Sequence, residues 1–149
     1  MNQIQPFPLW LGHAGDVSEW RTIYEADIKA LIHLAAEEPA SQPPRDFIYC
    51  RFPLVDGPGN APLLIHLAVN TLTALLRKET RTLVYCGGGL SRSPVIAAAA
   101  LASMGKGSLH DCLLKVKAHH ACDVSPGLWE ELVSLLPELA NEGQRSSAS

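Results

Sequence analysis

The chain has 149 residues, of which 47% are hydrophobic and 18% are charged, and its formal net charge at neutral pH is −3. This length suits one domain with a sizeable core, and the hydrophobic fraction excludes intrinsic disorder. The mild acidity argues against bulk electrostatic binding of nucleic acid or of an anionic membrane, so any bound anion needs a local site.

The amino-terminal residues show no basic segment followed by an apolar run, and no apolar stretch of membrane-spanning length occurs in the sequence. The four cysteines, Cys50, Cys86, Cys112 and Cys122, have no C-x-x-C spacing and are few for a disulfide-stabilised secreted scaffold. We therefore expect a cytoplasmic protein in which at least one cysteine is a working thiol.

Hydrophobic spacing and turn residues predict helices and strands in alternation. In chain order these are a helix over 17–26, strands over 29–34 and 47–52, a helix over 62–79, a strand over 83–85, and helices beginning at 94, 108 and 125. Asp16 and Glu19 have the spacing of a capping box for the first helix, and Asn60 is the expected cap of the second. Pro53 is expected to end the second strand.

The alternation of strands and helices, without an internal repeat, predicts a single-domain α/β fold. Its sheet should be mostly parallel, with about four to five strands flanked by helices, and should occupy residues 1–140. The polar segment 141–149 is expected to be a disordered tail.

The segment between the strand at 83–85 and the helix at 94 has the features of a phosphate-binding loop. Cys86 and Arg92 flank five residues, which are Gly87, Gly88, Gly89, Leu90 and Ser91. Glycines allow the backbone N–H groups to converge on one anion, and the following helix adds free donors and the positive end of its dipole. The planar guanidinium of Arg92 can hold two oxygens of a tetrahedral oxyanion.

A thiol at this position has the environment of a nucleophile. The helix terminus and the neighbouring guanidinium favour the thiolate, so Cys86 could attack phosphorus in line and form a phosphocysteine. Ser93 could donate a hydrogen bond to the sulfur when it leaves in the second half-reaction. A packing cysteine would require neither the glycines nor the Ser-Arg-Ser-Pro ending.

This segment resembles the signature H-C-x₂-G-x-S/x-R-S/T of the cysteine-dependent protein phosphatases, specifically their small, atypical dual-specificity type. The resemblance implies a tyrosine-phosphatase-like fold, Cys86 as nucleophile, the backbone of 87–92 with Arg92 as phosphate site, and Ser93 as the assisting hydroxyl. Further landmarks are Leu9 to Gly12, the loop around Asp56, and Ser125 to Trp129, so the resemblance covers about residues 9–136. Tyr85 departs from the family histidine and should change how the thiolate is tuned.

Cleavage of a phosphate ester also needs a proton donor for the leaving oxygen. Of the six aspartates, Asp16 is assigned to a helix cap, Asp27 and Asp46 border strands, and Asp111 and Asp123 fall in later helical segments. Asp56 follows a strand end in a flexible Gly/Pro loop, and the resemblance places the general acid at about this distance before the cysteine. A plain Asp-Gly turn is the alternative interpretation.

Two other groups invite interpretation. Cys50 could form a protective disulfide with Cys86 or could be a core thiol. His119, His120 and Cys122, with Cys112 upstream, fit no common metal-ligand spacing, so we expect neither a metal nor another cofactor.

The leading hypothesis is a phosphomonoester hydrolase acting on phosphotyrosine, with phosphoserine and phosphothreonine as further candidate substrates. The alternatives are a phosphate-binding pseudophosphatase, suggested by Tyr85, and a rhodanese-like sulfurtransferase, which would not need Asp56. Arsenate reductases and low-molecular-weight phosphatases carry the motif near the chain start and fit less well. Because no lysine or arginine lies between Cys86 and Arg92, a phosphorylated protein or small aryl phosphate is the expected substrate, rather than a polyphosphorylated inositol lipid. The sequence leaves the oligomeric state open.

Overall fold

The computed structural model describes residues 1–140, which contain one five-stranded sheet. Its strands are β1 (Asn2–Gln3), β2 (Leu9–His13), β3 (Ala30–Ala35), β4 (Ile48–Leu54) and β5 (Thr82–Cys86). The order is β1-β2-β5-β3-β4, and only β1 and β2 pair antiparallel. The predicted α/β fold with a mostly parallel sheet is therefore confirmed, while the predicted tail, residues 141–149, lies outside the described residues.

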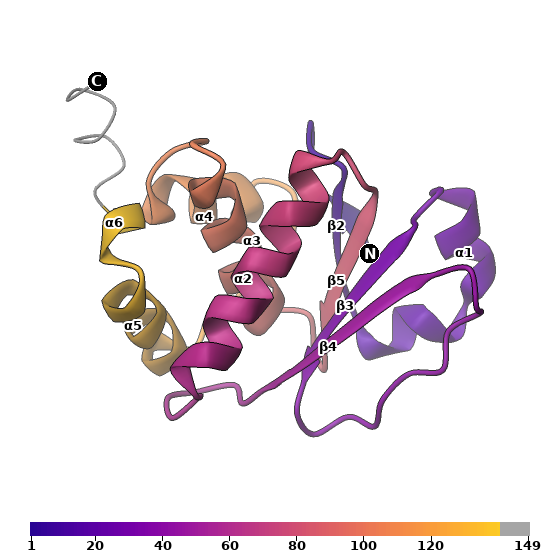
Figure 1. Cartoon of the computed structure of the whole chain (residues 1–149), viewed down its shortest axis with the longest axis horizontal. Helices are drawn as coiled ribbons and strands as arrows, with labels where there is room; N and C mark the ends of the chain where they lie inside the picture. The colour runs from indigo at the N-terminus through magenta and orange to yellow at the C-terminus, as the bar shows by residue number, and fades with distance from the viewer. Residues whose placement is uncertain (141–149) are drawn as a thin grey trace.

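Helices cover both faces of the sheet, but unequally. They are a 3-10 helix η1 (Ala14–Ser18) and the α-helices α1 (Trp20–Glu25), α2 (Pro62–Arg77), α3 (Arg92–Ser103), α4 (Leu109–Lys117), α5 (Pro126–Leu135) and α6 (Pro137–Ala140). Figure 1 shows α2 to α6 on one side of the sheet and α1 on the other. Strand alternation serves both layers, because Val84 and Cys86 face the larger core cluster whereas Leu83 and Tyr85 face the smaller one.

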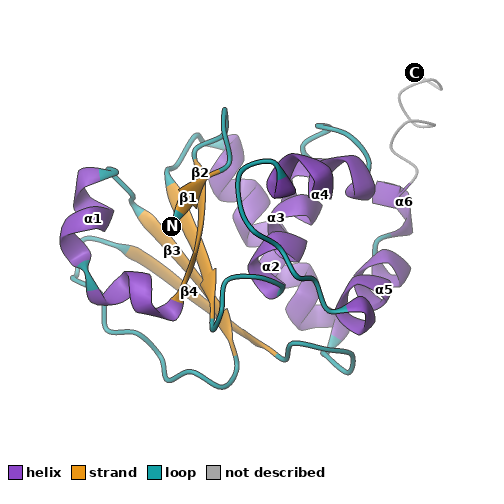
Figure 2. Ribbon diagram, turned by 180° about the vertical axis from the view of Figure 1, so that it is seen from behind, coloured by secondary structure: helices purple, strands orange, loops and turns teal. Residues whose placement is uncertain are grey.

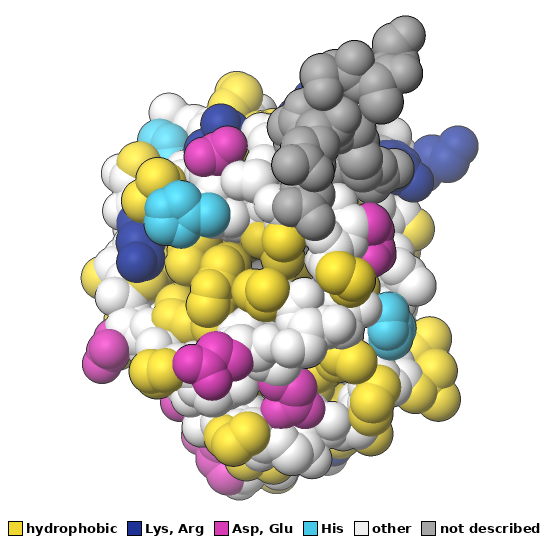
Figure 3. Space-filling view, turned by 90° about the vertical axis from the view of Figure 1, so that its left-hand side faces the viewer, with side chains coloured by type: hydrophobic (Ala, Val, Ile, Leu, Met, Phe, Trp, Pro, Cys, Tyr) yellow, Lys and Arg dark blue, Asp and Glu magenta, His cyan; other side chains and the backbone are white. Residues whose placement is uncertain are grey.

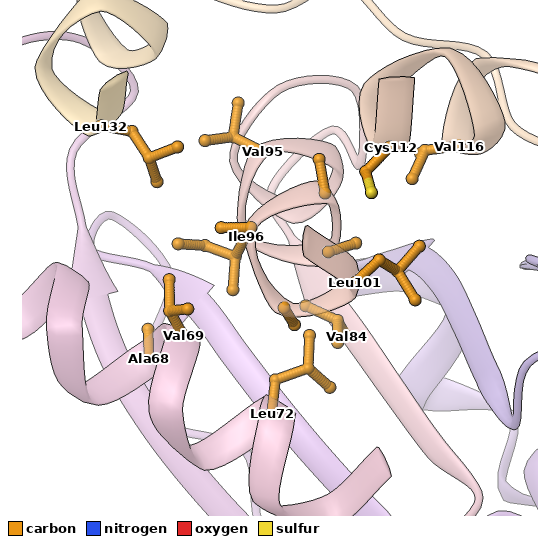
Figure 4. Close-up of a cluster of buried hydrophobic side chains, with 14 of the residues drawn as sticks. Ala68, Val69, Leu72, Val84, Val95, Ile96, Leu101, Cys112, Val116 and Leu132 are labelled. Carbon is orange, nitrogen blue, oxygen red and sulfur yellow. The ribbon is translucent and has the colours of Figure 1, made fainter. Parts of the chain in front are cut away.

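Helix α3 is the centre of the larger core. Every residue from Arg92 to Ala102 is buried, and the run Ala97–Ala100 lets neighbouring helices approach closely. Figure 4 shows Val95, Ile96 and Leu101 of α3 among side chains from α2, α4, α5 and β5. Such packing fixes α3, and with it the orientation of its amino-terminal turn.

The structure corrects two predictions for the first half of the chain and adds two strands to them. β4 runs through Pro53 to Leu54, which is tolerated because β4 is an edge strand and one side of its backbone needs no partner. Asn60 does not cap α2, whose N-cap is Ala61; its side chain instead bonds the preceding loop. β1 and β2 were not predicted as strands.

The predicted helix 17–26 is divided into η1 and the shorter α1. Asp16 does take part in a capping box, but as its third residue: Asp16 Oδ2 accepts from the N–H of His13, and His13 Nδ1 accepts from that of Gly15. The predicted helices after 94 and 108 are confirmed, with Arg92 as the first residue of α3 and with Ser108 as the side-chain cap of α4.

The surface of the described part adds two observations. Within residues 1–140, no helix has the length and hydrophobicity needed to cross a membrane. Figure 3 shows the face formed by the carboxy-terminal helices, where hydrophobic side chains gather in the middle and acidic side chains lie below them.

Candidate active site

The carboxyl ends of β3, β4 and β5 meet at one end of the sheet, where open α/β folds bind ligands. Each strand contributes a following loop, and these loops lie at the lower end of the sheet in Figure 1. Cys86 ends β5 with 1% of its surface exposed, and Arg92 begins α3 with 4% exposed. The five residues between them join the two elements, as the sequence predicts.

Two of the loop glycines are required by their surroundings. Gly89 has φ of +75°, and a Cβ there would lie 2.7 Å from the carbonyl oxygen of Gly12. A Cβ at Gly87 would lie 2.7 Å from Glu37 Oε1. Gly89 therefore permits the turn against β2, and Gly87 leaves room for the carboxylate of Glu37 behind the loop.

The backbone of the loop is available to an anion. Within residues 1–140, the N–H groups of 88–91 donate no hydrogen bond. Ser91 is the N-cap of α3, but its side chain does not cap the helix; Ser91 Oγ instead accepts from the N–H of Ser125 at 2.9 Å. The uncommitted donors and the positive end of α3 together form an anion-binding cradle.

Arg92 is held in place from behind by a residue that sequence reasoning missed. Its Nη1 donates to Glu37 Oε2 at 2.6 Å and to the carbonyl oxygen of Leu54 at 2.8 Å, and its Nη2 donates to Glu37 Oε1. The Arg92 guanidinium lowers the pKa of Glu37 to about 2. Arg92 Nε has no partner among the described residues, so this edge of the guanidinium remains free for a substrate oxygen.

Asp56 lines the same pocket as the thiol of Cys86. The pocket has a volume of about 160 Å³ and is lined by Asp56, Cys86, Gly88, Gly89, Leu90, Ser91, Arg92 and Asp123. The loop that carries Asp56 is anchored rather than free: Asn60 bonds the backbone of Val55 and Gly57, and Glu131 on α5 accepts from the N–H of Gly59 at 2.7 Å.

Asp123 is a second residue near the phosphate loop, after Glu37, whose position the sequence does not predict. It lies in the connection between α4 and α5 rather than in a helix, and it lines the pocket. The α4–α5 connection passes alongside the phosphate loop (Figure 2), where the N–H of Asp123 donates to the carbonyl oxygen of Leu90 at 2.8 Å. The pocket thus contains a carboxylate on each of two loops.

Tyr85 points away from the cradle, into the layer beneath the loop after β3. Its ring stacks on His33 with centroids 4.5 Å apart, and its hydroxyl lies 2.7 Å from Ser41 Oγ. Tyr49 holds the same loop by accepting from the N–H of Ser41 at 2.9 Å. Burial raises the pKa of Tyr85 and lowers that of His33 to about 4, so both rings are neutral at physiological pH.

The structure also shows the positions of Ser93 and Cys50 and of the candidate metal ligands. Ser93 is fully buried, and its Oγ has no hydrogen-bond partner among the described residues. Cys50 pairs in register with Ile32, which in turn pairs with Val84, two residues before Cys86. Two inter-strand spacings and this offset place the Cα atoms of Cys50 and Cys86 more than about 10 Å apart, too far for a disulfide. No group of three potential metal-ligating side chains occurs within 1–140.

Comparisons with known proteins agree with this fold. No family model matches the chain. Mouse dual specificity protein phosphatase 14 is 29% identical over 135 residues, a match covering 88% of this chain and 67% of that protein. The crystal structure of human DUSP28 superposes with a TM-score of 0.80 at 22% identity, covering all of both chains. A mouse putative dual specificity phosphatase complexed with zinc tungstate gives 0.81 at 22% identity, covering 95% of this chain and 89% of that one.

Proposed function

We propose that this chain, which belongs to the small dual-specificity type of the cysteine-dependent protein phosphatases, hydrolyses phosphate monoesters of phosphotyrosine and of phosphoserine or phosphothreonine. The observation that carries the proposal is the cradle itself: a thiol at its floor, uncommitted backbone donors around it, the free Nε edge of Arg92, and Asp56 in the same pocket.

In the first half-reaction, the Cys86 thiolate attacks phosphorus while the loop N–H groups and Arg92 hold the non-bridging oxygens. The bond from phosphorus to the ester oxygen breaks, and Asp56 donates the proton that lets this oxygen leave as an alcohol or phenol. The product is a phosphocysteine and an ionised Asp56.

In the second half-reaction, the Asp56 carboxylate removes a proton from a water molecule, whose oxygen attacks phosphorus. The S–P bond breaks, its electron pair returns to the sulfur, and inorganic phosphate is released. The uncommitted hydroxyl of Ser93 stabilises the departing sulfur by donating a hydrogen bond. The reaction needs no metal or other cofactor.

Two further features of the proposed function follow from the same chemistry. A catalytic thiol must stay reduced, and reducing conditions prevail in the cytoplasm, so we propose a cytoplasmic location. The fold and the carboxylate in the pocket favour a phosphatase over a sulfurtransferase, which would carry a persulfide on the cysteine and would not need an acid. The intact Cys86, Arg92 and Asp56 favour an active enzyme over a pseudophosphatase.

The decisive experiment measures hydrolysis of an aryl phosphate by the wild type, Cys86→Ser and the control Cys50→Ser. We expect Cys86→Ser to be inactive but to bind tungstate, and Cys50→Ser to retain activity. Rapid acid quenching of the wild type should trap one phosphoryl group per chain on Cys86. Full activity in Cys86→Ser, or a wild type without turnover, would overturn the proposal.

A further inference from the structure

Asp123 has no role in the reaction described above, although it lines the catalytic pocket. The connection between α4 and α5, which carries Asp123, is hydrogen-bonded to three successive residues of the phosphate loop. His120 Nε2 lies 2.6 Å from the carbonyl oxygen of Gly89, the N–H of Asp123 donates to Leu90, and that of Ser125 donates to Ser91 Oγ. The backbone position of Asp123 relative to the phosphate loop is therefore fixed by the fold.

The charges around the pocket are unusual for a site that binds an anion. Among the residues that line it, Arg92 is the sole cation, and its charge is balanced by Glu37 behind the loop. Asp56 and Asp123 place two carboxyl groups at the pocket. The phosphate can be held by neutral backbone donors, but the groups that flank it on the substrate meet an acidic surface.

We propose that Asp123 is a specificity-determining residue, which selects phosphorylated segments with a lysine or arginine beside the phosphoresidue and disfavours those with an acidic residue or a second phosphate. The proposal rests on the proposed phosphatase function and concerns the same site. Asp123 is solvent-exposed, so a flexible cationic side chain of a substrate can reach it while most of its length stays in water.

The expected size of the substrate preference follows from the solvent exposure of the ion pair between Asp123 and a cationic side chain of the substrate. An exposed ion pair changes an equilibrium about two- to fivefold, and a like-charge contact opposes binding by a similar factor. Because the two factors multiply, the ratio of kcat/KM between a basic and an acidic substrate should be roughly four- to twenty-five-fold larger with Asp123 than without it. Salt should reduce the ratio, because exposed charges are screened.

The test uses two phosphotyrosine peptides of equal length, one with arginine and one with glutamate on each side of the phosphotyrosine. The proteins are the wild type, Asp123→Asn, Asp123→Lys and the control Glu79→Gln, which makes the same charge change as Asp123→Asn at the opposite end of β5. We expect the wild type and the control to prefer the basic peptide, Asp123→Asn to lose most of this preference, and Asp123→Lys to reverse it.

A basic-to-acidic ratio that is the same in the wild type and Asp123→Asn would overturn the proposal. So would a uniform loss of rate on both peptides, since that would assign Asp123 to the chemistry instead of to selection. Failure of the proposed function is a separate outcome, recognised by the absence of Cys86-dependent hydrolysis of an aryl phosphate by the wild type.

Discussion

The contact between Glu37 and Arg92 gives the sharpest prediction for stability. Glu37→Gln removes the negative charge and one of the two acceptors that hold the guanidinium. The pKa of Glu37 falls from 4.5 to about 2, which at about 1.4 kcal/mol for each pKa unit sets a ceiling near 3 kcal/mol. Because 55% of the Glu37 side chain is exposed, solvent screening reduces the expected loss to about 1 kcal/mol.

The pH dependence gives this prediction its sign. A carboxyl group whose pKa is lowered by folding stabilises the protein fully above its unfolded value of 4.5, and this contribution is lost as the pH falls through about 2. The difference in free energy of unfolding between the wild type and Glu37→Gln should therefore be constant above about pH 5. It should shrink steadily as the pH is lowered from there toward 2.

Urea denaturation at pH 7, 5 and 3.5 measures this difference, with Glu38→Gln as the matched control. Glu38 lies one residue away, and its side chain makes no hydrogen bond or ion pair within the described part of the chain, so its substitution should cost little. Equal losses in both variants, or a loss in Glu37→Gln that does not diminish at pH 3.5, would refute the reasoning.

The activity of Glu37→Gln separates two opposing effects. Removal of a negative charge near the cradle would by itself tighten phosphate binding, whereas a less constrained Arg92 would bind the transition state less well. Because Arg92 is buried and only its Nε edge is free, we expect orientation to dominate, so kcat/KM for an aryl phosphate should fall roughly threefold to tenfold. An increase in kcat/KM would show that Glu37 restrains binding through its charge.

Three more substitutions test the remaining parts of the site. Arg92→Lys should lower kcat/KM by at least about a hundredfold, because an ammonium group cannot replace the planar fork; retention within a few-fold in the aryl phosphate assay would contradict this. Asp56→Asn should lower kcat about a hundredfold for poor leaving groups and much less for good ones, and should flatten the alkaline limb of the pH profile of the rate. A loss of rate that is independent of the leaving group would place the general acid elsewhere, and Asp123→Asn is the comparison variant. Tyr85→Phe should cost about 1 kcal/mol in urea denaturation through loss of the contact with Ser41, and should speed amide hydrogen exchange in the loop after β3; unchanged exchange would show that the phenol does not anchor that loop.

The features that the sequence predicts well are local ones. The phosphate loop, its strand and its helix are contiguous from Thr82 to Ser103, so glycine content and hydrophobic spacing suffice to find them. Helix α2 is equally readable, because its buried residues recur at helical spacing. The sequence predicts an end of β4 at Pro53, whereas the strand continues to Leu54, because only tertiary structure shows which strand lies at an edge.

The features that the sequence does not reveal depend on contacts between distant segments. Glu37 is 55 positions before Arg92 in the chain. Asp123 is hydrogen-bonded to Leu90 although both α3 and α4 lie between the two residues in the sequence. One signal for Glu37 was present: it follows the carboxyl end of a predicted buried strand, where parallel sheets gather functional side chains. For Asp123 no such signal exists, because its place in a loop depends on where α4 ends at Lys117.

The departure at Tyr85 also takes on a different meaning in the folded chain. Sequence reasoning treats residue 85 as a neighbour of the nucleophile, but strand alternation sends its side chain to the opposite face of the sheet from Cys86. There the phenol lies beside Ser41, in the loop that also carries Glu37, the partner of Arg92. Because the buried phenol is neutral, its influence on the cradle runs through the placement of that loop, and a substitution at 85 should be felt at the arginine as much as at the thiol.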